Sequence, residues 1–94
     1  MKILHLNLQA KWYDMIERGE KLEEYREIKP FWCNRLAKFN SDLFKDELFV
    51  KFYYGYTSKT MVFQLKGIKT GRGNPLWGAP NYNVFVLSLG ERVQ

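Results

Sequence analysis

The sequence predicts a mainly β, α+β fold: a small mixed β-barrel of about five to six strands, with two short helices packed beside it or across its end. Most apolar segments alternate with the two-residue period of a strand, and only two follow the period of a helix. Two short helices cannot cover both faces of an open sheet, whereas strands that curl into a barrel bury the apolar face and remove exposed edges. The 94 residues, of which 46% are apolar, fit a single domain spanning residues 1–94 with one core.

The chain begins with a predicted strand over residues 2–8, in which three alternating leucines face the core. Residues 10–18 then follow the helical period, and Gly19 stands where a helix end favours left-handed backbone. The apolar stripe of this helix consists of Trp12, Met15 and Ile16. We expect these side chains to pack in the core.

Residues 21–28 predict a strand that carries charge on both faces. The two-residue period puts Leu22, Glu24, Arg26 and Ile28 on one face and Lys21, Glu23, Tyr25 and Glu27 on the other. A surface strand needs only one charged face, so we expect one of the two sets to point into a polar cleft. Lys21 lies opposite Glu24 and Arg26 unless a bulge just before it turns it toward them.

The chain then predicts a second helix and a pair of strands. Pro30 opens a helix that reaches about Phe39, and residues 40–46 form a polar loop. The apolar face of this helix consists of Trp32, Leu36 and Phe39. Two alternating segments, 48–54 and 60–69, flank a short turn and predict an antiparallel hairpin.

A long loop and one more strand complete the pattern. The run Gly71-Arg72-Gly73-Asn74-Pro75 breaks the strand period and begins a loop that extends to about Tyr82. The last strand, over residues 84–89, is nearly all apolar, which predicts a central place in the sheet.

Positive charge is confined to the C-terminal half. Residues 1–47 hold nine Lys/Arg and nine Asp/Glu, whereas residues 48–94 hold six Lys/Arg and one acid, Glu91, which gives 6 − 1 = +5. A half with charge of one sign is typical of a protein with an anionic partner, nucleic acid first, although a solubilising surface gives the same pattern.

Three features bear on location. No apolar run approaches the ~18 residues of a membrane span, so we expect no membrane partner. The single cysteine, Cys33, has no second cysteine with which to form an internal disulfide, and we expect the alternating N-terminal segment to be a strand instead of a signal peptide. Together these favour a reducing cytoplasm.

The segment Gly19-x-Lys21-x-x-Glu24-x-Arg26, placed after an opening strand and helix, resembles the signature of the ASCH domain, a family of the PUA-like superfamily. The extended form over residues 19–32 is similar to a branch of small single-domain bacterial and phage members. Further pieces in the expected order are Gly71-x-Gly73, Trp77-Gly78-Ala79-Pro80 and Phe85-Val86-Leu87-x-Leu89-Gly90.

The resemblance implies a PUA-like pseudo-barrel with a cleft beside the signature strand and a role in binding RNA or modified nucleosides. A few family members resemble amidohydrolases that act on N4-acetylcytidine, in which a Lys, a Thr three residues on and a distal Glu carry the chemistry. Lys21 matches the Lys, but Glu24 stands at the Thr position, where a carboxylate cannot supply the attacking hydroxyl. The distal Glu is also missing, because residues 48–90 contain no acid and Gln64 is the expected occupant of that strand.

Lys21, Glu24 and Arg26 are the candidate site residues of the charged segment. A Glu24–Arg26 pair leaves donors on the guanidinium for a phosphate or a base edge. In an enzyme, Lys21 would act as base or charge stabiliser and Glu24 as general acid or base. The same residues could instead form a buried structural ion pair that fixes the strand register.

Aromatic and basic residues of the C-terminal half are further candidates for binding nucleic acid. Trp77 follows a Gly/Pro-rich loop and is the best candidate for an exposed stacking ring. Arg72, Lys66 and Lys69 are candidate phosphate contacts, and the single histidine, His5, is expected to be structural. One His and one Cys cannot form the usual zinc site, so we expect no metal and no other cofactor.

The sequence is compatible with three functions. The first is a binding module for RNA or a modified nucleoside, RNA before DNA, with a polar cleft between residues 19–26 and 71–80. The second is a hydrolase acting on a modified nucleoside such as an N4-acylcytidine, or on RNA. The third is a protein-interaction accessory domain of a phage or mobile element. The sequence alone predicts no particular oligomeric state.

Overall fold

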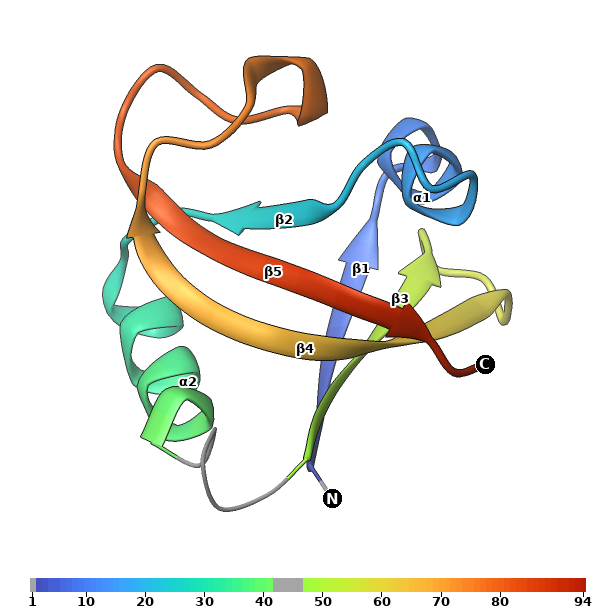
Figure 1. Ribbon diagram of the computed structural model, residues 1–94, viewed down its shortest axis with the longest axis horizontal. Helices are drawn as coiled ribbons and strands as arrows, with labels where there is room; N and C mark the ends of the chain where they lie inside the picture. The colour runs from blue at the N-terminus through green and yellow to red at the C-terminus, as the bar shows by residue number, and fades with distance from the viewer. Residues whose placement is uncertain (1, 42–46) are drawn as a thin grey trace.

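The sheet of this protein has five strands and curls into a half-barrel (Figure 1). The computed structural model describes residues 2–41 and 47–94. The strands are β1 (Lys2–Leu8), β2 (Glu23–Arg26), β3 (Leu48–Tyr54), β4 (Thr60–Gly71) and β5 (Val84–Arg92), in the sheet order β1-β3-β4-β5-β2. β1 and β3 run parallel, and the other neighbouring pairs are antiparallel. The predicted fold class, a curled mainly β sheet with two helices, is confirmed.

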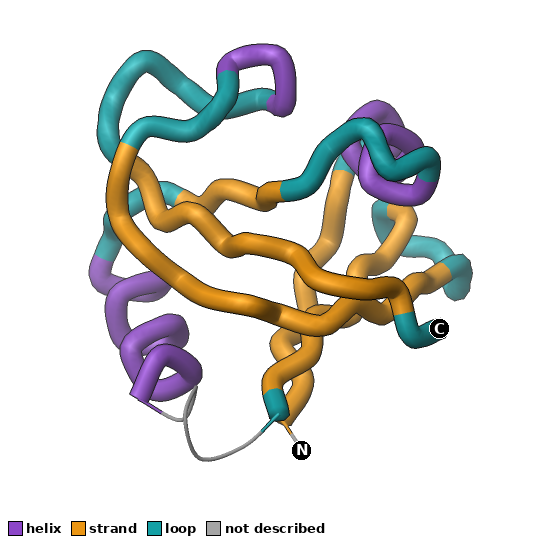
Figure 2. Tube along the Cα trace, in the orientation of Figure 1, coloured by secondary structure: helices purple, strands orange, loops and turns teal. Residues whose placement is uncertain are grey.

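Irregularities in the pairing of β4 with β5 accompany the curl. The register shifts between Phe63 and Leu65 and again between Leu65 and Gly67. Such bulges bend a strand and increase its twist, so the two longest strands carry the sheet around the core (Figure 2). The predicted hairpin of β3 and β4 is confirmed, and β4 runs to Gly71. β5 has a neighbour on each side, as its apolar sequence predicted.

The inner face of the sheet holds the main core. The alternating leucines of β1 are at most 4% exposed, as predicted. They belong to one buried cluster with Val50 and Phe52 of β3 and with Leu87 of β5. Full burial of a side chain of this kind stabilises the fold by about 1.5–3 kcal/mol, so this cluster is the main source of stability.

Helix α1 differs from the prediction in the face that it buries. α1 (Ala10–Glu17) buries Tyr13 and Ile16. The Tyr13 ring meets the Tyr54 ring of β3 edge-on, with 5.0 Å between ring centres. This contact orients the helix so that Trp12 and Met15 are only half-buried. The predicted stripe was therefore wrong at these two positions.

Helix α2 covers the other end of the core. α2 (Pro30–Ser41) packs through buried Leu36, with Trp32 and Phe39 partly buried, as predicted. Residues 40 and 41 of the predicted polar loop belong to this helix, and residues 42–46 lie outside the described residues. Within residues 2–41 and 47–94, no helix has the length and apolar character needed to cross a membrane.

β2 is shorter than the predicted strand of residues 21–28. Its four residues pair with β5, and Glu24 lies opposite Leu87. Leu22 and Ile28 lie beyond the strand and are 55% and 47% exposed, so the predicted strand face shared with Glu24 and Arg26 does not extend to them. The alternation of side chains holds only where the chain is extended.

β1 and β2 are the two edges of the sheet and do not pair as strands. Nη2 of Arg26 donates a hydrogen bond of 3.1 Å to the carbonyl oxygen of Asn7, so one side chain of β2 bridges to β1. We call this line between β1 and β2 the seam.

Candidate functional site

The turn after α1 positions Lys21. Gly19 has a φ of 80°, the left-handed conformation expected at a helix end. The backbone N–H of Lys21 donates to the carbonyl oxygen of Met15 at 3.1 Å, which keeps the chain in a turn until β2 begins. Lys21 therefore precedes the strand. Of the two orientations that the sequence left open, Lys21 adopts the one toward Glu24, because strand alternation does not apply to a residue of the turn.

The Lys21 ammonium group is almost fully buried and has several partners. Its side chain is 1% exposed, and Nζ lies 3.2 Å from Oε1 of Glu24. Nζ also donates to the carbonyl oxygen of Trp77. It lies 4.7 Å from the centre of the Tyr25 ring and 5.1 Å from that of Trp12. A cation over an aromatic face is attracted by the ring, so these groups replace the water that burial removes.

Glu24 and Arg26 share one face of β2, as predicted. Oε2 of Glu24 accepts a hydrogen bond of 2.8 Å from Nη1 of Arg26. Since Oε1 faces Lys21, each oxygen of this carboxylate meets a cation. Nη1 of Arg26 also donates to the carbonyl oxygen of Tyr25 at 3.0 Å. The Arg26 side chain is 20% exposed, so it belongs both to the buried cluster and to the surface.

Burial governs the electrostatics of this cluster. It lowers the pKa of Lys21 from its usual value, and the charge of Glu24 opposes that change. A buried ion without a partner costs several kcal/mol, so the carboxylate is what allows two cations to lie at this point. The cluster has the form of the structural ion pair considered from the sequence, but Arg26 also reaches solvent.

The loop of residues 72–83 packs closely over this region through two glycines. A Cβ on Gly73 would lie 2.4 Å from Cε1 of Tyr25, and a Cβ on Gly78 would lie 2.8 Å from Cζ2 of Trp12. Gly78 has in addition a φ of 95°, which only glycine adopts without strain. Glycine at both positions thus lets the loop backbone reach the aromatic rings around Lys21.

Tyr25 connects the same loop to β2 through a hydrogen bond. Its hydroxyl group donates to Oε1 of Glu23 at 2.8 Å and accepts from the backbone N–H of Asn74 at 2.9 Å. Burial raises the pKa of Tyr25 from 10.0 to about 12, and hydrogen bonding to Glu23 acts in the same direction. The phenol therefore keeps its proton and its hydrogen bond to Glu23 throughout the neutral range.

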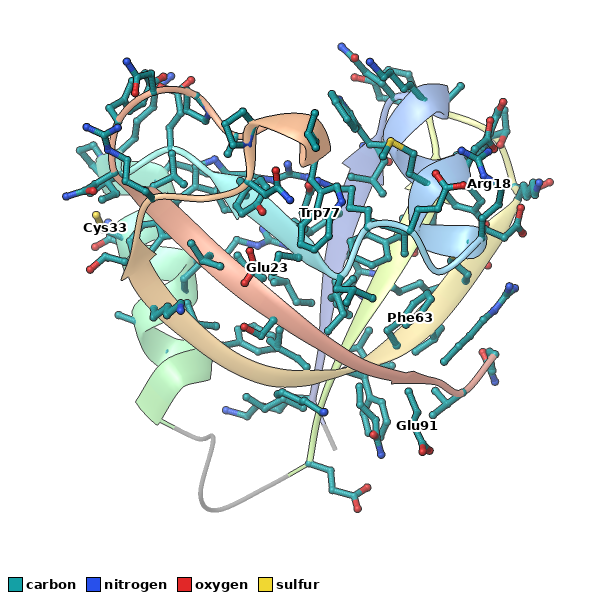
Figure 3. All side chains as sticks on the ribbon, turned by 45° about the horizontal axis from the view of Figure 1, so that its top comes forward. Arg18, Glu23, Cys33, Phe63, Trp77 and Glu91 are labelled. Atoms are coloured by element: carbon teal, nitrogen blue, oxygen red, sulfur yellow. The ribbon has the colours of Figure 1, made fainter. Side chains whose placement is uncertain are left out.

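A cleft of about 440 Å³ opens beside the cluster. Its lining comes from three segments: residues 7–9 with Trp12, residues 24–27 of β2 and its end, and Trp77 with Gly78. Figure 3 shows Trp77 where the loop approaches α1. Glu24 and Arg26 supply polar groups, and the three aromatic residues of the lining supply flat apolar surface. The volume lies within the ~300–1,000 Å³ typical of small-molecule sites.

The structure brings some of the predicted site residues together and separates others. Glu24, Arg26 and Trp77 line the cleft, and Lys21 lies directly behind it. Trp77, the best candidate for an exposed ring, is half-buried against the cluster around Tyr25 and is therefore only partly open to solvent. The reason is that the loop folds back onto β2.

Three predicted phosphate contacts lie outside this cleft. Lys66 and Lys69 are exposed on β4, and Lys69 lines a different pocket beside α2. Arg72 is exposed in the loop, where its Nη1 donates to Oδ1 of Asn81 at 2.6 Å. Their contact with nucleic acid stays a prediction.

Sequence reasoning missed one wall of the cleft. We expected Trp12 to pack in the core and did not assign residues 7–9 to the site, yet both line the cleft. The sequence does contain a signal for Trp12. The adjacent Tyr13 is a second large side chain that could form the buried face of α1, and burying Tyr13 leaves Trp12 at the side of the helix. For residues 7–9 no local signal exists, since they adjoin β2 only through the curl of the sheet.

Among residues 2–41 and 47–94, no three His, Cys, Asp or Glu side chains gather in a way that could hold a metal ion. Comparisons of the chain with protein-family models, with curated proteins and with solved structures give no match.

Proposed function

We propose that this domain binds RNA or a modified nucleoside and holds one base in the cleft beside Glu24 and Arg26. The observation that supports it is a buried carboxylate–guanidinium pair that borders a cleft of about 440 Å³ with Trp12 and Trp77 in its lining. Stacking of a base on an aromatic side chain contributes about 1–3 kcal/mol and tolerates any base. The ASCH resemblance of residues 19–32 favours the same role.

The polar groups of the cleft suit the edge of a base. Each oxygen of Glu24 keeps lone-pair capacity beyond its one cation, so the carboxylate can accept from an amino or imino group. Arg26 uses three of its five N–H donors on described partners and can donate to a ring nitrogen, a carbonyl or a phosphate. Bases are accessible in this way when they are unpaired, which favours single-stranded RNA over a duplex.

The single cysteine fits action in a reducing cytoplasm.

Calorimetry with a short single-stranded RNA at about 50 mM salt tests the proposal. We expect measurable binding whose affinity falls as salt rises, with a slope near −0.7 for each phosphate neutralised. Arg26→Gln should weaken binding at least about tenfold, because it removes a charge-assisted donor. Absence of binding by RNA and by nucleosides at low salt would show the proposal to be wrong.

The same variant separates binding from a purely structural role. Circular dichroism and urea unfolding show whether Arg26→Gln remains folded. A folded variant that has lost affinity supports the binding site. A variant that unfolds, while Trp77→Phe leaves RNA affinity unchanged, supports the structural ion pair instead.

A hydrolase acting on an acylated nucleoside is a second candidate, and one observation favours it. The pKa of Lys21 is lowered by burial, and Nζ lies 3.2 Å from Glu24, an arrangement common among acid–base pairs. Lys21 does not line the cleft, so Glu24 would be the group that meets substrate. Deacylation of an N4-acylcytidine by the wild type, lost in both Lys21→Met and Glu24→Gln, would support it. No turnover by the wild type would exclude this reaction.

A further inference from the structure

A second cleft lies along the seam, next to the first. It has a volume of about 420 Å³ and lies between β1 and the first turns of α2. Its lining from α2 consists of Phe31, Trp32 and Arg35, and its lining from β1 includes His5. Asn7 and Arg26 line both clefts, so the two hollows adjoin at the hydrogen bond that bridges the seam.

We propose that this second cleft is a subsite for the adjoining nucleotide, so that the domain binds at least two consecutive nucleotides of a single strand. The inference rests on the proposed function and extends it. The first base would occupy the cleft beside Glu24, the second would stack at Phe31, and the phosphate between them would meet Arg26.

Phe31 supplies the stacking surface of this subsite. It is 62% exposed, although it is a large apolar residue on a helix whose buried face is formed by others. The Trp32 ring meets the Phe31 ring nearly at a right angle, with 4.9 Å between centres. The ring is therefore supported by a second ring while much of it remains open to solvent. An exposed ring beside cations is the usual platform for an unpaired base.

The charge of the second cleft is suited to a phosphate backbone. The guanidinium of Arg26 lies 5.3 Å from the centre of the Trp32 ring, and that of Arg35 lies 5.9 Å from the centre of Phe31. No carboxylate lines this cleft within the described part of the chain. Glu27 lines the first cleft but not the second, and it pairs with Lys29 at 3.3 Å.

The edge of β1 supplies polar groups along the same path. No strand pairs with this side of β1 in the described residues, and the Asn7 carbonyl already turns toward the seam. The His5 ring is oriented by a hydrogen bond of 2.8 Å between its Nδ1 and the hydroxyl of Tyr53. A path with backbone groups on one side and rings on the other matches an extended single strand.

A length series tests the proposal on the full chain. Single-stranded RNAs of one, two and four nucleotides, each with a 5′-phosphate, are titrated by calorimetry at about 50 mM salt. We expect affinity to rise at least about tenfold from one nucleotide to two, the increment of one stacked base. Phe31→Ala should remove most of this increment and leave the one-nucleotide affinity within about twofold. Arg35→Gln should reduce the salt slope for the longer RNAs by about 0.7.

The controls separate failure of this inference from failure of the proposed function. Tyr56→Ala removes another exposed ring, 98% exposed in the β3–β4 turn, and should change no affinity. Alanine at Phe31 favours the helix, so unfolding midpoints should match the wild type. Equal affinity for one and two nucleotides, or an equal loss in Phe31→Ala for both lengths, would overturn the second subsite while the first stands. No binding at any length would overturn both.

Discussion

The two halves of this chain use their charges in opposite ways. The first 47 residues have equal numbers of acids and bases, and the second half carries the whole net charge of +5. The structure places the acidic and basic side chains of both clefts in the neutral half, as Glu24, Arg26, Glu27 and Arg35. The lysines of β4 remain in solvent. Net charge thus leads only to the expectation of an anionic partner, whereas the burial of paired charges gives the position of the candidate site.

The reason is the cost of desolvation. An exposed lysine such as Lys66 needs no partner and can stand anywhere on the surface, so its position carries little information. Lys21 can be buried only where a carboxylate and aromatic rings compensate it. The second half contributes shape to the cleft instead of charge, through Trp77 and the close approach of Gly73 and Gly78.

The largest expected effect comes from removing the charge that balances the cluster. Glu24→Gln keeps the shape of the side chain but leaves Lys21 and Arg26 without a counterion, so we expect a loss of about 3–5 kcal/mol in the free energy of unfolding. Urea unfolding at pH 7 measures it. Glu91→Gln, at an exposed acid of the second half, is the matched control and should change stability by less than about 0.5 kcal/mol.

A double variant sharpens this result. Lys21→Met combined with Glu24→Gln removes the buried cation along with its counterion, so it should recover at least half of the loss. Equal losses in the single and double variants would mean that Glu24 acts through Arg26 alone.

The next largest effect is a pH dependence of the free energy of unfolding that Tyr25 causes. Its folded pKa of about 12 lies above the usual 10.0, so between these values the unfolded chain loses a proton that the folded chain keeps. Stability must then fall as pH rises from about 10 to 12, by up to about 3 kcal/mol. Tyr25→Phe should lack this decrease when urea unfolding is compared across the same range.

Lys21 titrates with the opposite sign. Its lowered folded pKa makes stability rise with pH toward its usual value of 10.5, in the wild type and in Tyr25→Phe alike. The difference between the two proteins therefore isolates the phenol. Parallel curves above pH 10 would show that Tyr25 ionises as readily in the folded chain as in the unfolded one.

The second half of the chain shapes the cleft through the close packing of its loop, and substitution of glycines tests this contribution. Gly73→Ala places a methyl group 2.4 Å from the Tyr25 ring, so we expect a loss of about 2 kcal/mol and a weaker affinity for RNA as the loop moves. Gly71→Ala is the matched control, because a methyl group there meets nothing within 4 Å. Equal stability of the two variants in thermal unfolding would mean that the loop moves away from the added methyl group without loss of free energy of unfolding.

The smallest effects are expected at the lysines of β4. Lys66→Gln and Lys69→Gln should change stability by less than about 0.5 kcal/mol and RNA affinity by less than about threefold. Each should reduce the salt slope by about 0.7 only if the lysine contacts a phosphate. A loss of affinity greater than that of Arg26→Gln would reverse the comparison and place the main interface in the basic half.

Much of the site followed from local spacing. Charge on both faces of residues 21–28 predicted that one set would turn toward a polar cleft, and Glu24 and Arg26 do share a face beside one. The prediction failed where the strand ended: Leu22 and Ile28 lie outside β2, and Lys21 reaches Glu24 from a turn. Strand ends depend on pairing with β5, which the spacing of residues 21–28 does not contain.

The sequence by itself determined the elements of this protein, the mainly β class and the pairing of Glu24 with Arg26, because side-chain periods and short-range ion pairs are local properties. Only the tertiary structure decided that Trp12 and Asn7 complete the cleft, that Trp77 is half-buried, and that two clefts adjoin along the seam. These depend on how far the sheet curls and on where the loop of residues 72–83 comes to rest. Both result from contacts between residues far apart in the chain, which no pattern of neighbouring residues specifies.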